Sequence, residues 1–167
     1  MKGNMKRLLA LLLCVTQLTG FVPHVHAEEA TPAEAELGVL EAALRDILER
    51  TCLCFEEDDA QAARNVEPLE ETIDRIIEKI RVHHIRRLQS GECTMQLGFI
   101  LNDLLTNCER VSDHCSNIAL SVIEEKIDVD TERLGRHAYL NDLKADSDFT
   151  SSLERDLEKY RLPKYSK

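Results

Sequence analysis

Apolar residues recur every three or four positions in three long stretches of the chain, which is the spacing of amphipathic helices. Thr31-Pro32-Ala33-Glu34 has the form of a capping box with proline at the first helical position, so we expect the first helix to begin there. One apolar stripe then continues to about Ala63 and comprises Leu37, Leu40, Leu44, Ile47, Thr51 and Phe55. The pattern therefore predicts a long first helix.

Two further helices follow with the same spacing. The second is predicted to begin near Pro68, where the missing N–H of proline costs nothing, and to end at Gln89-Ser90-Gly91. The third is predicted from about Cys93 to Ile127, roughly 50 Å at 1.5 Å per residue. Three long helices joined by short turns must alternate in direction, so the predicted fold is an all-α, antiparallel three-helix bundle over residues 31–127. Residues 128–167 are predicted to form a loop and short helices, near 137–143 and 151–160.

A helical projection divides the third helix into two sides. One side is predicted to be core and consists of Leu97, Leu101, Leu104, Leu105, Cys108, Val111, Cys115, Ile118, Ala119 and Val122. The opposite side, which we call the polar arc, consists of Asn102, Asp103, Thr106, Asn107, Glu109, Arg110, Asp113, His114 and Asn117. Short Asn, Asp and Thr side chains are poor helix formers, so the arc indicates a compensating interaction, either with a cation or with another chain. A solvated surface of incidental composition is the alternative.

Composition agrees with this fold. The 167 residues are 43% hydrophobic and 31% charged, with no Trp and 4% aromatic residues, which is typical of one globular helical domain. The formal net charge is −10, and the first 27 residues contain three basic residues and no acid, so the remainder is still more acidic. This charge disfavours nonspecific nucleic-acid binding.

Residues 1–27 have the pattern of a targeting segment. A positively charged start is followed by an apolar run from Leu8 to Val22 and by a Val25-His26-Ala27 ending, as in secretory signals. The run is short for a membrane span, which needs about 20 residues. A cleaved signal, an uncleaved membrane anchor and the remnant of a lost membrane domain remain open, so this segment indicates export or anchoring.

The cysteines do not predict a disulfide framework. Cys14 lies in the apolar run, which leaves an odd set of five in the predicted bundle. Cys108 and Cys115 are seven residues apart on one helical face, where a free thiol behaves as a small apolar group. Cys52 and Cys54 have no second pair at a spacing that suits zinc.

Two acidic pairs are candidate ligands for a metal ion. Glu70 and Asp74, and likewise Glu109 and Asp113, are four residues apart, so each pair lies on one face of its helix. Such carboxylates repel each other unless a cation lies between them, and their oxygens suit Mg²⁺, Ca²⁺, Mn²⁺ or iron. Solvated carboxylates near a helix start are the alternative. His84 continues the apolar stripe of the second helix and is predicted to lie in the core.

The segment from Leu105 to Ala119 resembles the signature helix of the PhoU family. The matching residues are Glu109-Arg110-Val111, Asp113-His114 and Asn117-Ile118-Ala119. Val66 to Asp74 resembles the preceding helix of that family, and His137 to Leu140 with Tyr160 to Pro163 resembles the tail of sodium/phosphate cotransporters. The resemblance covers about residues 35 to 163.

This resemblance implies a non-catalytic regulatory or accessory domain of sodium-dependent phosphate transport or phosphate homeostasis, derived from or related to a cotransporter without its membrane domain. Its expected partner is a membrane transporter or a regulatory protein of phosphate uptake, with a homo-oligomer also possible. It implies a metal cluster of divalent ions or iron at Glu70, Asp74, Glu109 and Asp113. The family resemblance places the domain at the cytoplasmic face of the membrane, in conflict with a secretory signal.

The remaining polar residues are expected to form an interaction face or to support the ligands; they are Asp103, Asn107, Arg110, His114 and Asn117. A metal-binding bundle that is exported or anchored and acts as an interaction module is the second interpretation. The sequence shows no nucleophile with a base at motif spacing and no glycine-rich phosphate loop, so we expect no enzymatic activity.

Overall fold

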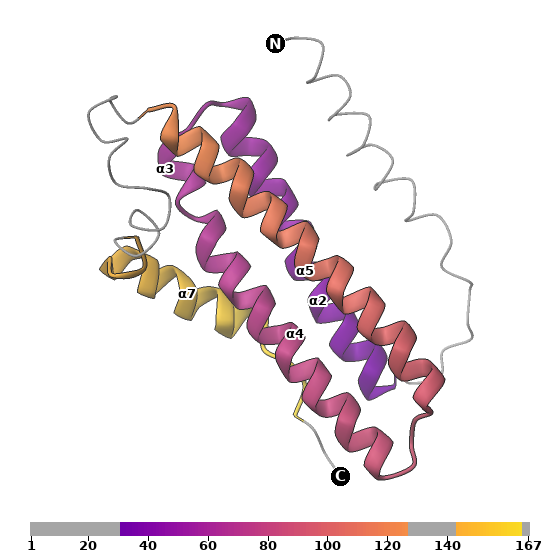
Figure 1. Ribbon diagram of the computed structural model, residues 1–167. Helices are drawn as coiled ribbons and strands as arrows, with labels where there is room; N and C mark the ends of the chain where they lie inside the picture. The colour runs from indigo at the N-terminus through magenta and orange to yellow at the C-terminus, as the bar shows by residue number, and fades with distance from the viewer. Residues whose placement is uncertain (1–30, 127–142, 165–167) are drawn as a thin grey trace, which may run out of the picture.

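The structure is a computed structural model that describes residues 31–126 and 143–164 (Figure 1). These residues form α2 (Pro32–Glu56), α3 (Ala60–Ala63), α4 (Val66–Gln89), α5 (Met95–Glu124) and α7 (Ser147–Lys159), and no strand occurs among them. The predicted all-α bundle is therefore confirmed. The targeting segment at residues 1–27 and most of the short helix predicted near 137–143 lie outside the described residues.

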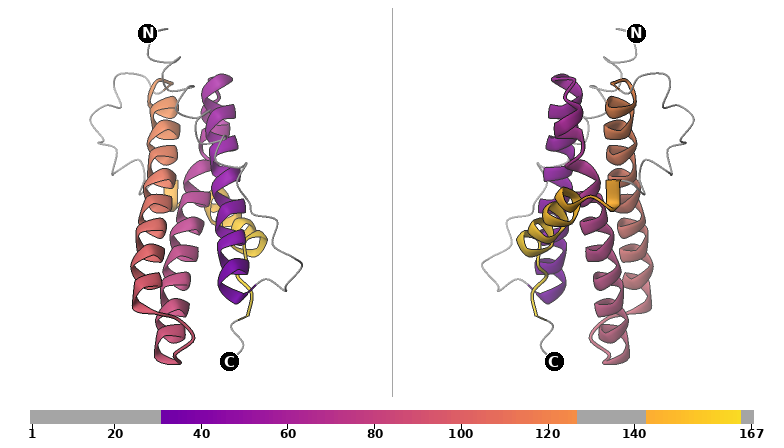
Figure 2. Two further views of the ribbon diagram at one scale, coloured as in Figure 1. Left: turned by 90° about the vertical axis from the view of Figure 1, so that its right-hand side faces the viewer. Right: turned by 90° about the vertical axis from the view of Figure 1, so that its left-hand side faces the viewer.

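Three long helices make up the bundle. α2 and α5 run in the same direction and α4 runs against both, and each of the three packs on the other two. α7 crosses the outer side of α4, on the side of the bundle away from α5 (Figure 2). The short turn between α4 and α5 contains Gly91 at a φ of 78°, a left-handed conformation that glycine adopts without strain.

The start of α2 is the predicted capping box. The Thr31 hydroxyl accepts a hydrogen bond from the Glu34 N–H at 3.3 Å, and the Glu34 carboxylate accepts one from the Thr31 N–H at 2.8 Å. The predicted end at Ala63 is wrong, because α2 stops at Glu56. Asp58 has a φ of 53°, which breaks the helix, and the Asp59 side chain caps the separate short helix α3.

The centre of the core is a row of isoleucines on α4. Ile73, Ile77 and Ile80 have no exposed surface, and they are enclosed by apolar residues of α2 and α5. His84 continues this row and is 8% exposed, so the predicted core histidine is confirmed. The other fully or nearly fully buried residues of the cluster include Leu40, Ala43, Ile47, Cys54, Leu69, Leu105, Cys115 and Ala119.

The predicted core side of α5 is only partly correct. Leu105, Cys115, Ala119 and Val122 are buried, but Leu97, Leu104 and Val111 are 54%, 45% and 38% exposed. Ser112 and Ser116 are buried in their place. The buried side of α5 is thus turned toward α4 relative to the prediction, and the Ser116 hydroxyl there donates a hydrogen bond to the Glu67 carboxylate of α4. Phe55 of α2, predicted in the stripe, is 44% exposed.

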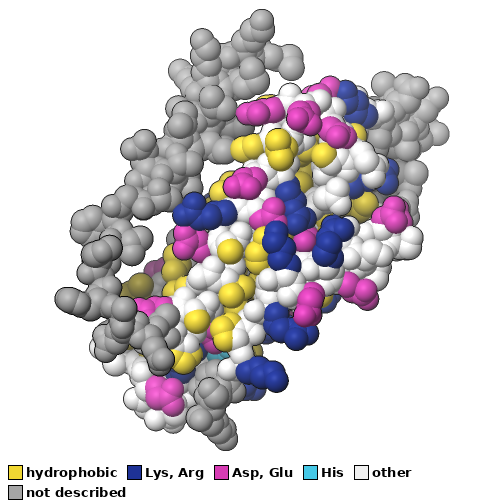
Figure 3. Space-filling view, turned by 180° about the vertical axis from the view of Figure 1, so that it is seen from behind, with side chains coloured by type: hydrophobic (Ala, Val, Ile, Leu, Met, Phe, Trp, Pro, Cys, Tyr) yellow, Lys and Arg dark blue, Asp and Glu magenta, His cyan; other side chains and the backbone are white. Residues whose placement is uncertain are grey.

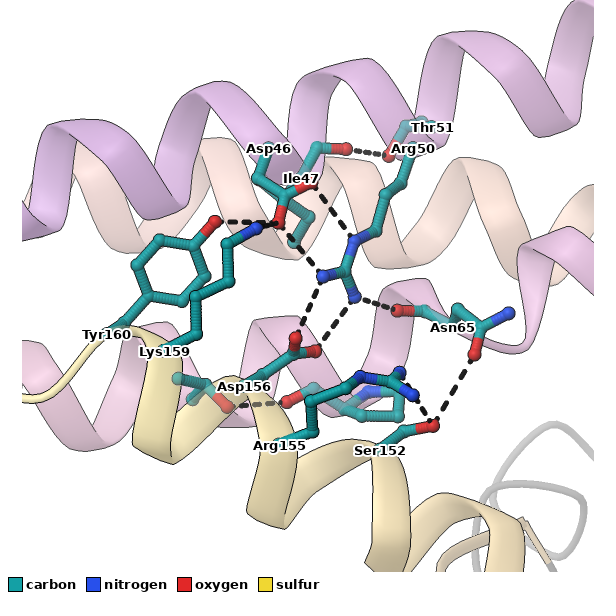
Figure 4. A network of polar contacts seen from close by, with 12 residues as sticks. Asp46, Ile47, Arg50, Thr51, Asn65, Ser152, Arg155, Asp156, Lys159 and Tyr160 are labelled. Atoms are coloured by element: carbon teal, nitrogen blue, oxygen red, sulfur yellow. Dashed lines mark hydrogen bonds and ion pairs between the residues drawn. The ribbon is translucent and has the colours of Figure 1, made fainter.

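A polar network attaches α7 to α2 (Figure 4), in addition to the buried apolar side chains of Phe149 and Tyr160. Both guanidinium nitrogens of Arg50 donate to the carboxylate of Asp156 at 2.8 Å, and Asp156 is 1% exposed. Asp46 accepts hydrogen bonds from Tyr160 at 2.6 Å and Lys159 at 2.9 Å. Burial works against the ionised form of Asp46, but hydrogen bonds from Arg50, Tyr160 and Lys159 lower its pKa to about 2.

A second buried ion cluster joins α2 to the far end of α4. Glu36 is 2% exposed, and its carboxylate contacts the His83 Nδ1 at 2.6 Å and the Arg87 guanidinium at 2.9 Å. Sequence patterning alone gave no reason to bury Glu36, because an acid early in a helix is usually solvated. The first ion cluster therefore joins α2 to α7, and the second joins α2 to α4.

Gly98 of α5 lies where α5 touches α4, and it supplies a test of this packing. A Cβ built there would lie 2.8 Å from the buried His84 Nε2, whereas one at Gly38 of α2 would meet nothing within 4 Å. We expect Gly98→Ala to lower the free energy of unfolding by about 1–2 kcal/mol through this overlap. Gly38→Ala, the matched control, is expected to raise it by about 0.5–1 kcal/mol, because alanine is the better helix former. Urea denaturation of both variants measures this, and equal stabilisation by both would contradict the close contact.

Candidate functional site

The predicted acidic residues of α4 and α5 lie near one another across the interface between the two helices. Glu70 and Asp74 are partly buried on α4, and the charge of Asp113 on α5 acts on both of them. Glu109 is also close enough to act on Asp74. The structure therefore brings the two predicted acidic pairs into one group, which we call the acidic cluster: Glu70, Asp74, Glu109 and Asp113.

Two members of the acidic cluster hold their protons unusually tightly. Burial, together with the charges of Glu67 and Asp74, raises the pKa of Glu70 to about 8. Burial and the charges of Glu109 and Asp113 raise the pKa of Asp74 to about 6. Near neutral pH, Glu70 is thus largely protonated, which relieves its repulsion mainly with Glu67 and Asp74 of α4 and to a lesser degree with Asp113 of α5.

Nearby cations offset only part of this negative charge. Arg81 forms an ion pair with Glu109 at 2.7 Å, and Lys144, from the segment before α7, lies 3.2 Å from Glu71 and 3.6 Å from Glu67. The Oδ1 atom of Asp74 is buried and has no hydrogen-bond partner. A buried carboxylate oxygen without a partner is costly, so the acidic cluster has a place for one more donor or cation.

The chemistry of this donor set suits hard cations, but the side chains do not converge on one point. Carboxylate oxygens are preferred ligands of Mg²⁺, Ca²⁺ and Mn²⁺. Within residues 31–126 and 143–164, no group of three or more His, Cys, Asp or Glu side chains is arranged to hold a metal ion. In the arrangement described, Glu109 is instead directed to Arg81.

Glu67 belongs to the same face of α4 and was missed by the analysis of the sequence. It is 6% exposed and accepts a hydrogen bond from the Ser116 hydroxyl of α5 at 2.5 Å. The sequence did contain a sign that Glu67 belongs with the acidic residues. It precedes Glu70 by three residues and Asp74 by seven, and positions at these spacings share one helical face. The buried serine opposite it could not be recognised from the spacing of apolar residues.

The polar arc of α5 is exposed along most of its length. Asp103, Asn107, Arg110, Asp113, His114 and Asn117 are all exposed, and Glu109 is intermediate. The Asn107 amide donates to the carbonyl of Asp103 at 2.9 Å, and the Asn117 amide donates to that of Asp113 at 2.8 Å. Both bonds are made to the preceding turn of α5 itself. They therefore reduce the free-energy cost of placing asparagine in a helix without any contact to another chain.

The histidines and cysteines do not form a second site in the described part of the chain. His83 contacts Glu36 at the opposite side of α4 from the acidic cluster, and His114 is exposed on α5. His137 lies outside the described residues. The five cysteines of the described residues are free thiols: Cys52, Cys54, Cys93, Cys108 and Cys115. Of the two predicted to serve as apolar groups, Cys115 is buried and Cys108 is partly buried; Cys54 is buried as well.

Other surfaces of the bundle offer no alternative site of clear chemistry. A depression of about 600 Å³ lies between α4 and α7, and its walls include Arg75, Lys79, Glu154 and Glu158 but no member of the acidic cluster. On the face seen from behind in Figure 3, lysine and arginine side chains gather among acidic ones. The polar arc differs from this face in charge, because it contains no lysine and a single arginine, Arg110.

Residues 40–122 match the PhoU domain. The match covers most of α2, all of α4 and most of α5, and so includes the whole acidic cluster. It extends over just under half of the chain. PhoU domains are regulatory domains of phosphate uptake and are generally not catalytic. No curated protein and no solved structure matches the chain.

The PhoU match says nothing about a membrane segment. Of the helices within the described residues, none combines the length and apolar character that crossing a bilayer requires. The apolar run from Leu8 to Val22 lies outside those residues.

The raised pKa values predict how stability depends on pH. Because Glu70 and Asp74 have higher pKa values in the folded state, the stability they contribute is complete below about pH 4 and is lost as pH rises toward 8. We expect Glu70→Gln to raise the free energy of unfolding at pH 8 by on the order of 1–2 kcal/mol and to flatten its decline between pH 5 and 8.

Glu71→Gln is the matched control for this experiment. Burial disfavours the ionised Glu71, but hydrogen bonds from Lys144 and Arg75 lower its pKa, so its neutralisation is expected to destabilise the bundle. Urea denaturation between pH 5 and 8 compares the two variants. A Glu70→Gln variant no more stable than the unmodified chain at pH 8 would contradict the repulsion described.

Proposed function

We propose that this chain regulates phosphate uptake by binding a membrane phosphate transporter, or a regulator of one, through the polar arc of α5. The match of residues 40–122 to the PhoU domain carries the regulatory part of this proposal. The proposed transporter partner is a sodium/phosphate cotransporter. This part of the proposal rests on the C-terminal tail, His137 to Leu140 with Tyr160 to Pro163, which resembles the tail of that family. No step of catalysis is assigned to any residue.

The exposure of the polar arc supports its use as a contact surface. The arc includes Asp103, Thr106 and Asp113, which are spread over about three helical turns, and all three are exposed. Of the described helices, only α2, α3 and α4 pack against α5, and they cover its other side. Short polar side chains lose little conformational entropy when a partner orders them, which favours binding at such a surface.

A transport assay with targeted substitutions tests this function. In the cell that carries the gene, we expect its deletion to change the dependence of labelled phosphate uptake on external phosphate and sodium. Reintroduction of the full chain is expected to restore it, whereas Asn102→Arg with Thr106→Arg, which places bulk and positive charge on the arc outside the acidic cluster, is expected not to.

Glu49→Arg, at an exposed position of α2 away from the arc, is the control and is expected to restore regulation fully. Unchanged phosphate uptake after deletion would refute a role in phosphate uptake. Full restoration by the arc variant would leave that role standing and remove the arc as its binding surface.

A second candidate function, cation binding at the acidic cluster, is favoured by a specific observation. The partnerless Oδ1 of Asp74 lies buried beside carboxylates whose mutual repulsion a cation would relieve. Glu70, Asp74, Glu109 and Asp113 would hold the ion, and Glu109 would have to leave Arg81. A divalent ion or iron there would neutralise the cluster and tie α4 to α5.

Metal content and thermal stability test cation binding together. We expect the purified chain to retain about one equivalent or more of a divalent ion or iron, and added Mn²⁺ or Mg²⁺ to raise its melting temperature. Asp74→Asn with Asp113→Asn is expected to abolish both effects, while Asp103→Asn, on the same helix outside the cluster, should preserve them. Negligible metal and no shift in melting temperature would exclude this candidate.

A further inference from the structure

An exposed apolar row runs along α5 and is not used by the bundle. Leu97, Ile100, Leu104 and Val111 are 54%, 65%, 45% and 38% exposed, and we call them the α5 seam. Their spacing of three, four and seven residues is that of the a and d positions of a coiled coil. By its register on α5, the row lies between the polar arc and the buried side of the helix.

We propose that the α5 seam is a dimer interface on which α5 of a second copy of this chain packs in the antiparallel direction. This inference goes beyond the regulatory function proposed above and does not depend on it. A surface that pairs with its own copy across a two-fold axis must be complementary to itself. The charges that flank the seam meet this requirement.

Asp103 and Arg110 flank the seam on its outer side at equivalent positions, one heptad apart. Both are exposed, and neither side chain has an ion-pair partner among the residues that the structure describes. In an antiparallel pair in which Ile100 lies opposite Val111 of the second copy, Asp103 lies opposite Arg110 of that copy. The two-fold axis repeats the contact, so one register forms two opposite-charge pairs.

The inner side of the seam also fits a second helix. Leu101 and Cys108 lie there and are partly buried against the core, so a helix on the seam would extend that core rather than meet charged groups. Asn107, on the seam itself, would lie opposite Leu104 of the second copy. A polar residue at one such position favours a defined register over sliding.

The area of the seam suits a reversible dimer. A half-exposed leucine or isoleucine leaves on the order of 100 Å² of apolar surface in water, so the four residues leave roughly 350–400 Å². A standard interface covers about 800 Å² per partner, of which a little over half is apolar. The seam thus supplies most of the apolar centre, and Asp103, Asn107 and Arg110 supply the polar rim.

Sedimentation velocity of the full chain over a dilution series from about 1 to 200 µM measures the association. We expect a reversible monomer–dimer equilibrium. Asp103→Arg places a positive side chain opposite Arg110 of the second copy at both symmetry-related contacts. It is therefore expected to weaken association at least tenfold. The double variant Asp103→Arg with Arg110→Asp is expected to restore it, because exchanging the two charges preserves both pairs.

Leu104→Glu is expected to abolish the dimer without loss of helix content, since its side chain is exposed in the single bundle. Leu53→Glu is the control and is expected to leave the dimer intact. Leu53 is also 54% exposed, but it lies on the face of α2 that carries Asp46 and Arg50 and is directed to α7, away from the seam. Circular dichroism of each variant confirms folding.

A chain that remains monomeric at 200 µM overturns the proposal, including the case in which the apolar run from Leu8 to Val22 covers the seam instead. A dimer that is insensitive to Leu104→Glu and to Asp103→Arg overturns it as well, because association would then use another surface. Failure of the charge exchange to restore binding would exclude the antiparallel register. The deletion experiment tests phosphate regulation separately, because it removes the whole chain and does not depend on whether Asp103, Asn107 and Arg110 of the polar arc also belong to a dimer interface.

Discussion

Ile73, Ile77 and Ile80 have no exposed surface, and α2, α5 and α7 all pack against the helix that carries them. This isoleucine row is the central constraint of the structure, because a chain of this size has one apolar core to stabilise it. Glu70 and Asp74 lie beside this row on α4, at the margin of the core where the helix meets α5. The burial of the neighbouring isoleucines therefore holds these carboxylates close to those of α5, although they repel one another.

The acidic cluster and the polar arc share Glu109 and Asp113, but their remaining members differ in physical character. Glu70 and Asp74 are partly buried and have raised pKa values, so their surroundings oppose their charge. Asp103 and Asn107 are exposed and make no contact with another helix of the described residues. The first group suits a proton or a cation, whereas the second suits a protein surface. The match to the PhoU domain includes both.

Two buried ion clusters complete the fold where apolar packing ends. Arg50 and Asp156 attach α7, and Glu36 with Arg87 joins α2 to the last turn of α4. Charged pairs of this kind add less to stability than apolar packing of the same volume, but they penalise any arrangement that separates the partners. They therefore specify how the helices are placed, while the isoleucine row supplies most of the stabilisation.

The sequence by itself determined the helices and the grouping of the acids: apolar spacing fixed α4 and α5, the Thr31 capping box fixed the start of α2, and the four-residue spacing placed each acidic pair on one face. Such features depend on neighbours along the chain. Only the tertiary structure decided that α2 ends before Asp58, that Glu36 and Ser116 are buried, and that Leu97 and Leu104 are exposed. The rotation of α5 about its axis depends on which residues face it from α2 and α4. Those residues cannot be identified from the apolar spacing of α5 alone.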